Sequence, residues 1–280
     1  MGLLSFFRRK KKSQDSVEEV KQGRKPKVAL CLGGGGARGF AHIGALKAFA
    51  EYGIDFDLCC GTSVGSLVGA FYCAGIDISD LVSYAHELEI KDVKTSKLLI
   101  GSDALSVGRI FTRRMGNMNI EDMLKPFSCV AVDLVTGKQV VFDSGSVSNA
   151  ISSSCAVPII FKPVVLGEKH LVDGGVLNNI PSSVCKMLGA DFVVAVDVNA
   201  TRGGGTTELG LFDVIKATYS IMSAHTSEEG LRMSDVIVSC DLSKFSAAKK
   251  DGYMEMIELG YNAAKEKIDD IKKLFETEIF

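Results

Sequence analysis

The sequence predicts an α/β fold in which a central, mostly parallel sheet is flanked by helices. Three short apolar runs, at residues 27–32, 57–60 and 191–198, have the length and continuity of strands that are buried on both faces. Segments with helical spacing of apolar residues follow the first two runs, at 40–52 and 64–74. Because parallel strands are joined by crossovers that are usually helices, this alternation indicates the class.

The remaining elements are predicted from the same patterns in chain order. Residues 76–127 are polar and poor in strand signals, so we expect them to be mainly helical, and they could cover the site as a lid. Runs at 128–133 and 138–142 flank a Thr-Gly turn and predict a hairpin. The other expected elements are a helix at 146–156, strands at 169–172 and 236–240, and helices at 211–231 and 253–275.

Composition limits the class of protein. The chain has 280 residues, 46% of them hydrophobic, which is enough for one large domain or two small ones with a real core. No apolar run approaches the roughly 18–20 residues of a membrane-spanning helix. The eight cysteines form no C-x-x-C pair, so we expect buried free thiols in a reducing cytoplasm rather than disulfides or a metal site. The sequence contains no repeat and no nucleic-acid-binding motif.

Residues 1–26 differ in character from the rest and are predicted to form a basic, amphipathic N-terminal tail. Through Lys27 the chain carries nine basic residues against three acidic ones. Leu3, Leu4, Phe6 and Phe7 precede a run of five basic residues at 8–12. Such a segment could anchor the protein at an anionic membrane surface, on the inner face of the membrane, or could be a solvated leader.

Residues 61–65, Gly61-Thr62-Ser63-Val64-Gly65, match G-x-S-x-G, a sharp strand-to-helix turn that exposes a serine hydroxyl. Gly61 and Gly65 carry no Cβ that would clash in so tight a turn. The N-terminus of the following helix favours negative charge beside the hydroxyl. Ser63 is therefore the candidate nucleophile, and the alternative is an ordinary Gly/Ser turn.

A glycine-rich loop follows the first predicted strand. The amides of Gly34, Gly35 and Gly36 are unobstructed by side chains and could point at one anionic oxygen, as an oxyanion hole requires. Arg38 adds a positive charge near the start of the next helix, and Gly39 completes the motif.

The same loop also fits G-x-G-x-x-G, the dinucleotide-binding pattern, with Asp57 at about the expected distance. In that fold the ribose-binding acid lies at the C-terminal end of the second strand, whereas Asp57 precedes the second apolar run. A dinucleotide-binding protein is therefore the less favoured alternative.

Asp173-Gly174-Gly175 ends the predicted strand at 169–172. If its carboxylate lies within hydrogen-bond reach of Ser63, Asp173 could act directly as a general base. The alternative is a turn in which Asp173 caps its own backbone.

A catalytic triad would need a histidine in addition. Ser63, Asp173 and His225 follow the serine, acid, histidine order of α/β-hydrolases. Order alone does not establish a triad, since geometry decides, so this mechanism stays open.

The glycine loop, the serine turn and the Asp-Gly-Gly element resemble, in this order, the motifs of bacterial patatin-like phospholipases. Residues 152–163 also resemble the family's small-residue helix that runs into an Ala-x-Pro segment. The likeness covers about residues 27–199. It implies a patatin-like three-layer fold over residues 27–280.

The resemblance also implies an activity and a site. The expected enzyme is a serine acyl hydrolase of the phospholipase A or lysophospholipase type, acting on a phospholipid or another acyl ester. Ser63 and Asp173 would form a dyad without histidine, metal or organic cofactor. The amides of residues 34–36, supported by Arg38, would form the oxyanion hole. A non-catalytic lipid-binding module remains the alternative of a different class.

Overall fold

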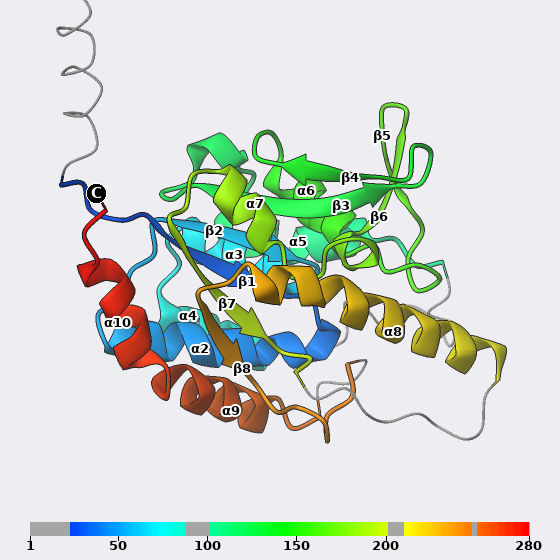
Figure 1. Ribbon diagram of the computed structural model, residues 1–280. Helices are drawn as coiled ribbons and strands as arrows, with labels where there is room; N and C mark the ends of the chain where they lie inside the picture. The colour runs from blue at the N-terminus through cyan, green and yellow to red at the C-terminus, as the bar shows by residue number, and fades with distance from the viewer. Residues whose placement is uncertain (1–22, 88–100, 201–209, 248–250, 280) are drawn as a thin grey trace, which may run out of the picture.

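The computed structural model describes residues 23–87, 101–200, 210–247 and 251–279 (Figure 1). Most of the predicted tail at 1–26 and part of the predicted lid at 76–127 therefore lie outside the described residues. Where the lid segment is described, it is mainly helical, as the sequence predicted.

An eight-stranded sheet forms the centre of the fold, with the strand order β5-β6-β3-β2-β1-β7-β8 and β4 paired to β3. The four pairings along β3-β2-β1-β7-β8 are parallel, whereas β4, β5 and β6 join by antiparallel pairings. The strands are β1 (Val28–Leu32), β2 (Leu58–Thr62), β3 (Phe127–Asp133), β4 (Lys138–Phe142), β5 (Val164–Leu166), β6 (Lys169–Asp173), β7 (Phe192–Asp197) and β8 (Val236–Ser239). The predicted hairpin is β3–β4, and the mostly parallel sheet is confirmed.

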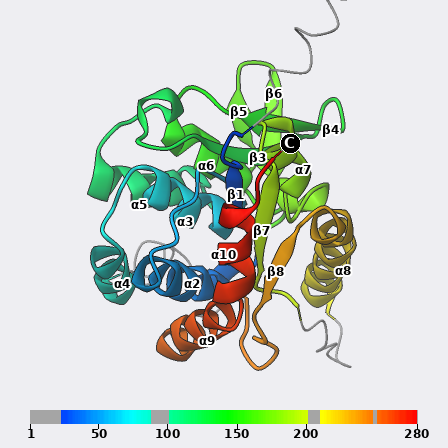
Figure 2. The same ribbon diagram turned by 60° about the vertical axis from the view of Figure 1, so that its left-hand side comes forward.

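Helices cover both faces of this sheet, so the fold has three layers (Figures 1 and 2). Along β1, Val28, Leu30 and Leu32 face one core cluster, while Ala29 and Cys31 face another. The first face carries α2 (Phe40–Glu51), α3 (Val64–Cys73), α4 (Ile78–Glu87), α5 (Leu105–Met115), α6 (Val147–Ser154), α9 (Tyr253–Lys265) and α10 (Ile268–Glu276). The second face carries α7 (Ser182–Met187) and α8 (Leu211–Arg232).

Two glycines allow α2 and α9 to pack in close contact. A Cβ at Gly44 would lie 1.8 Å from the carbonyl oxygen of Ile257, and one at Gly260 would lie 1.9 Å from that of Ala41. Only residues without a side chain permit two helix backbones to approach so closely. α2 and α9, from opposite ends of the described chain, thus pack in one layer.

The prediction of a single helix at 253–275 is wrong, because the structure has two helices there, α9 and α10. The chain turns at Lys267, whose amide bonds to the carbonyl of Ala264 at 2.9 Å. Beyond the turn Ile268 and Ile271 are buried, and Phe275 packs on Phe56 at 6.0 Å between ring centroids. Burial of these side chains fixes the turn, and no glycine or proline marks it in the sequence.

Two strand ends meet on β3. Thr62, the last residue of β2, pairs with Val130, and Asp173, the last residue of β6, pairs with Ala131, the next position along. Because β2 runs parallel to β3 and β6 antiparallel to it, their C-terminal ends point at each other. This topology brings Ser63 and Asp173 together across 110 residues of sequence.

Candidate active site

Ser63 occupies the turn between β2 and α3 in a backbone conformation that side chains rarely adopt, with φ 53° and ψ −128°. Such strain is retained where the surrounding structure enforces it, commonly at functional sites. The Ser63 amide donates to Ser154 Oγ at 2.9 Å. A Cβ at Gly65 would lie 2.2 Å from the carbonyl oxygen of Leu32, and one at Gly61 would lie 2.5 Å from that of Gly65. Both motif glycines are therefore needed for close backbone packing.

Asn179 and Asn199 hold the glycine loop, and the backbone carbonyl of Asn179 occupies one of the loop amides. The Gly34 amide donates to the carbonyl of Asn179 at 3.1 Å, and the Gly34 carbonyl accepts from Asn199 Nδ2 at 2.6 Å. The amides of Gly35 and Gly36 make no hydrogen bond with any described residue. Of the three predicted oxyanion donors, Gly34 is already used by the fold, which leaves Gly35 and Gly36.

Arg38 and Gly39 position this loop. The Arg38 guanidinium donates to the carbonyl of Phe245 at 3.0 Å and to Asn199 Oδ1 at 2.9 Å, so it acts on the loop through Asn199. Partial burial lowers the pKa of Arg38 from its usual value. A Cβ at Gly39 would lie 2.2 Å from Val64 Cγ2, so this glycine lets the loop rest against the start of the serine helix.

Asp173 is fully buried at the end of β6. Its Oδ1 accepts from the Gly175 amide at 2.8 Å, so the predicted turn capping does occur. Its Oδ2 is buried and has no hydrogen-bond partner of good geometry among the described residues. Gly174 brings the turn close to β3, since a Cβ there would lie 2.4 Å from the Val130 carbonyl oxygen. One carboxylate oxygen thus serves the fold and the other remains free for chemistry.

Burial raises the pKa of the Asp173 carboxyl to about 6. The Ser63 hydroxyl, the Gly175 amide and the Tyr219 hydroxyl each lower this pKa in part, because they stabilise the carboxylate. Both hydroxyls therefore lie close enough to act on Asp173, although neither makes a hydrogen bond of good geometry to Oδ2. Ser63 and Asp173, which the sequence analysis named as candidate nucleophile and base, thus lie close to each other.

Several residues at the site were not identified from the sequence. Cys155 lies beside the serine turn, with its Sγ 3.9 Å from Ser66 Oγ. Burial, followed by the charge of Asp173, raises the pKa of this thiol, so it stays neutral. Ser154 and Cys155 belong to the segment 152–163 that resembled the family, whereas no local pattern identified Asn179 or Tyr219.

None of the three histidines whose side chains the structure describes contacts Asp173 or Ser63. His225 has a side chain 83% exposed, and its Nδ1 lies 3.9 Å from Glu228 on the surface of α8. His170 is exposed on β6. His42 is buried, its Nε2 donates to the carbonyl of Gly33 at 2.8 Å, and burial lowers its pKa to about 4. The geometry therefore opposes a triad through His225.

Asp57 lies at the wrong end of the sheet for a dinucleotide site. Its carboxylate accepts from the amide of Val28 at 2.7 Å, where β1 begins, whereas the glycine loop follows the end of β1. The acid and the loop are thus separated by the length of the strand. This placement opposes the dinucleotide-binding alternative.

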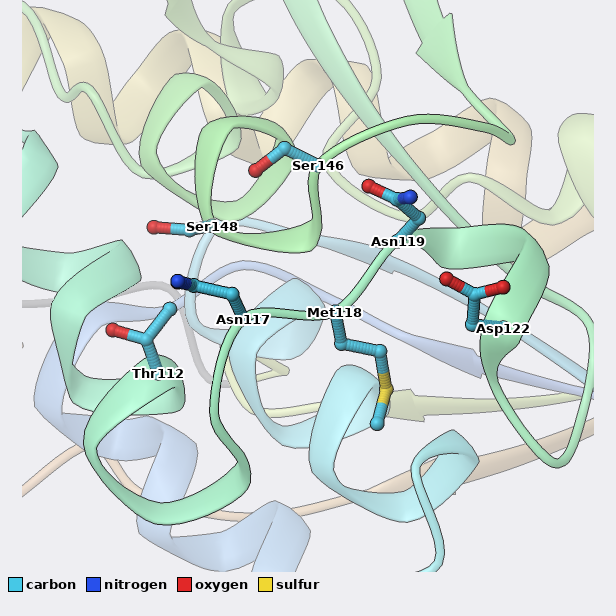
Figure 3. A pocket seen from close by; sticks show the side chains of 7 residues that line it. All are labelled: Thr112, Asn117, Met118, Asn119, Asp122, Ser146 and Ser148. Atoms are coloured by element: carbon cyan, nitrogen blue, oxygen red, sulfur yellow. The ribbon is translucent and has the colours of Figure 1, made fainter.

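A cavity of about 230 Å³ lies elsewhere on the molecule, between α5, the start of α6 and the segment that joins α5 to β3 (Figure 3). Its lining is mostly polar, and neither Ser63 nor Asp173 contributes to it. The candidate active site is therefore defined by its side chains and backbone rather than by this hollow. The cavity is lined by Thr112, Asn117, Met118, Asn119, Asp122, Ser146 and Ser148.

The described part of the chain holds no cluster of metal-binding side chains, since no group of three or more histidine, cysteine or acidic side chains there could hold a metal ion. All eight cysteines are buried free thiols. No helix within these ranges has both the length and the apolar character to cross a membrane.

Residues 30–185 match the sequence model of a family described as patatin-like phospholipase. The chain belongs to this family. An uncharacterized NTE family protein of Mycobacterium tuberculosis is 33% identical over 193 residues, which cover 66% of this chain and 52% of the relative. Lysophospholipase nte1 of Emericella nidulans is 27% identical over 278 residues, covering 88% of this chain and 18% of the relative. The chain thus spans about half or less of the length of these curated relatives.

Solved structures share the fold. VipD from Legionella pneumophila matches with a TM-score of 0.61 at 13% identity, covering 89% of this chain and 68% of VipD. Human GIVD cytosolic phospholipase A2 matches with a TM-score of 0.54 at 11% identity, covering 95% of this chain and 62% of that one. The family and the three-layer α/β fold predicted from the sequence are both confirmed.

Proposed function

We propose that this chain is a serine acyl hydrolase that cleaves fatty-acyl esters of lipids with Ser63 and Asp173 as a catalytic dyad. The observation that carries the proposal is the meeting of a strained serine at the end of β2 with a buried carboxyl at the end of β6. Membership of the patatin-like phospholipase family and the similarity to a lysophospholipase support a lipid ester as the substrate class.

The first half of the reaction acylates the serine. The Asp173 carboxylate takes the proton of the Ser63 hydroxyl as Oγ attacks the ester carbonyl carbon. The carbonyl oxygen becomes an oxyanion and accepts hydrogen bonds from the amides of Gly35 and Gly36. The intermediate then collapses, the carbon–oxygen bond to the alcohol breaks, and Asp173 returns its proton to the leaving alcohol. An acyl-Ser63 remains.

The second half releases the fatty acid. Asp173 takes a proton from a water molecule, whose oxygen attacks the acyl carbonyl carbon. The same two amides hold the second oxyanion. The bond to Ser63 Oγ breaks, the serine recovers its proton from Asp173, and the carboxylic acid departs. These steps call on no metal or organic cofactor.

The environment of Asp173 suits this role. An isolated aspartate is a weak base, but burial raises the pKa of Asp173 to about 6. A base is most effective when its pKa lies near the working pH, because it is then both ionised and basic. We therefore expect kcat/KM to rise with pH through about 6, as Asp173 becomes ionised.

A fluorophosphonate probe, which labels activated serines, tests the proposal. We expect labelling of the full chain and of Ser83→Ala, which removes an exposed serine hydroxyl on α4, but not of Ser63→Ala. Labelling retained in Ser63→Ala would contradict the choice of nucleophile. A wild-type chain that sediments with lipid vesicles but is neither labelled nor active on esters would instead be a non-catalytic lipid-binding module.

We further propose that residues 1–26 attach the protein to anionic membrane. The basic run at 8–12 and the apolar residues before it support this contact.

A further inference from the structure

One face of α8 carries a row of polar side chains that contacts Asp173 and the segment that follows it. Tyr219, Ser223, Thr226 and Ser227 are spaced so that they share one face of the helix. Ser223 and Ser227 are buried, although a surface helix normally turns its hydroxyl groups outward. Figures 1 and 2 show α8 lying on the face of the sheet that also carries α7. We call these four residues the polar row of α8.

Direct contacts seat this row on the segment that follows Asp173. Thr226 Oγ1 donates to the carbonyl of Gly175 at 2.9 Å, and Ser227 Oγ accepts from Asn179 Nδ2 at 3.0 Å. A Cβ at Gly230 would lie 1.9 Å from the carbonyl oxygen of Ile180, so the helix approaches the segment as closely as a backbone can. The position of the row relative to Asp173 is therefore fixed.

At the other end of the row, the Tyr219 hydroxyl lies beside the catalytic carboxyl. The point where a Cβ would stand on Gly175 is 2.8 Å from the Tyr219 hydroxyl oxygen and 3.1 Å from Asp173 Oδ1. Asp173 Oδ2 is the buried oxygen that has no partner of good geometry among the described residues. A carboxylate oxygen left without a donor is costly, and the Tyr219 hydroxyl is one of the two hydroxyl groups that stabilise the Asp173 carboxylate.

We propose that Tyr219 positions the catalytic acid: from the polar row of α8, its phenolic hydroxyl donates a hydrogen bond to the Asp173 carboxylate and keeps the other lone pairs directed at Ser63. In this role Tyr219 transfers no proton and touches no substrate. It acts through Asp173, and the inference rests on the proposed function of the dyad.

The groups that face Asp173 agree with this role. They are the Ser63 hydroxyl, the Gly175 amide, the Tyr219 hydroxyl and the thiol of Cys155, which follows α6, and none of them carries a charge. The Tyr219 hydroxyl lowers the pKa of Asp173. Burial, reinforced by the charge of Asp173, raises the pKa of Tyr219 well above its usual value, so the phenol stays a donor throughout the working pH range.

The test is the pH profile of kcat/KM for a soluble short-chain p-nitrophenyl ester, with each sample read at one final pH. We expect Tyr219→Phe to move the acidic limb upward by about one pH unit, the effect of losing one hydrogen bond to a carboxylate. The rate should fall about tenfold near pH 5 and remain within about twofold of wild type at pH 9, where Asp173 is ionised in both proteins. Tyr261→Phe is the matched control, because it removes a phenol that bonds to Glu51 at 2.6 Å, far from the dyad.

The possible results distinguish a failure of the proposed role of Tyr219 from a failure of the proposed hydrolase function. Loss of rate by the same factor at every pH, or an unshifted limb, would overturn the role of Tyr219 while leaving the dyad intact. A Ser63→Ala protein that keeps the wild-type rate would instead overturn the proposed function. If Tyr219→Phe does not fold, Ser223→Ala replaces it, since the Ser223 hydroxyl lowers the pKa of the Tyr219 phenol. A smaller shift of the limb in the same direction supports the inference, and no shift contradicts it.

Discussion

The two halves of the candidate site are built differently. The nucleophile half consists of β1, the glycine loop, β2 and the start of α3, all within residues 28–73 and packed by parallel pairing. The acid half consists of β6, the turn after it and α8, which join by antiparallel pairing and by side chains more than 40 residues apart. The serine is therefore fixed by local backbone geometry, whereas the acid depends on contacts between distant segments.

This difference indicates how each half responds to change. Every residue of β1 and β2 is buried, so substitutions there disturb the core itself. On the acid side, the first two residues of β6 are exposed, and side chains make the hydrogen bonds that join α8 to the segment after Asp173. We expect the nucleophile half to fail by unfolding or misplacement of its backbone, and the acid half to be tunable by single hydroxyl groups.

The largest expected effect removes one dyad member from each half. Ser63→Ala and Asp173→Asn should each lower kcat for ester hydrolysis by about 10³-fold or more, because one supplies the attacking oxygen and the other accepts its proton. Steady-state kinetics with a soluble ester measure this loss. Circular dichroism of both variants serves as the control for folding. If Asp173→Asn kept a tenth of the wild-type rate, another group would have to be the base.

A smaller loss is expected at the oxyanion loop. A Cβ at Gly35 would lie 2.4 Å from Val198 Cγ2, so Gly35→Ala must displace the loop and its amide. Loss of one oxyanion donor lowers kcat by about 10²-fold and leaves KM little changed, since the oxyanion forms only in the transition state.

The double variant Gly35→Ala/Val198→Ala relieves the contact that displaces the loop. It should recover part of the lost rate. A Gly35→Ala protein with the wild-type kcat would show that this amide does not contact the oxyanion.

Replacement of Asp173 should also change the free energy of unfolding, and the change should depend on pH. The pKa of Asp173 in the folded chain is about 6, above the ordinary 3.8, so the stabilisation present below pH 4 is lost as pH rises through 6. Asp173→Asn should therefore stabilise the fold at pH 8 by up to roughly 3 kcal/mol and have little effect at pH 4. Urea unfolding at the two pH values measures it. Equal free-energy changes at both pH values would be inconsistent with a buried, ionising Asp173.

His225 lies on the same helix as the polar row but on its exposed side. Its replacement by alanine should change kcat/KM by less than about twofold, within the range of ordinary surface substitutions. The same assay reports it. A loss of about 10³-fold would restore the triad and remove the Ser63–Asp173 dyad as a sufficient mechanism.

The smallest expected effect on soluble substrate comes from the tail. Deletion of residues 2–12 should leave hydrolysis of a soluble ester unchanged, because the dyad lies elsewhere in the chain. Sedimentation with phosphatidylglycerol vesicles should fall sharply, and wild-type binding should weaken as salt is added. Equal sedimentation of both proteins at every salt concentration would leave the tail without a role in membrane contact.

Much of the nucleophile half could be predicted from the sequence because its information is local. The serine turn, its glycines and the loop before it each occupy consecutive residues with a direct steric meaning. Even there, Gly34 bonds to Asn179, 145 residues further along the chain, through its amide and through its carbonyl. No pattern within the glycine loop itself predicts its contacts with Asn179.

The acid half could be predicted only in part. Asp173 was identified because two glycines follow it, but the antiparallel direction of β6 depends on its pairing with β3. Tyr219 lies 46 residues beyond Asp173 in a helix without a marked apolar stripe, so no periodicity singles it out. The turn between α9 and α10 could not be predicted either, because it depends on buried side chains and no glycine or proline marks it.

The first described residues lie at the end of the sheet where β1 begins, whereas Ser63 and Asp173 follow the C-terminal ends of their strands. Arg24 bonds to Asp191 at 2.6 and 2.7 Å, and its backbone pairs with Ile279, ahead of the residue where β1 begins. A bilayer contact made through residues 1–22 would therefore meet the domain at the end where β1 begins. Ser63 and Asp173 follow the opposite, C-terminal ends of β2 and β6, so the point of attachment and the candidate site would lie at different ends of the sheet.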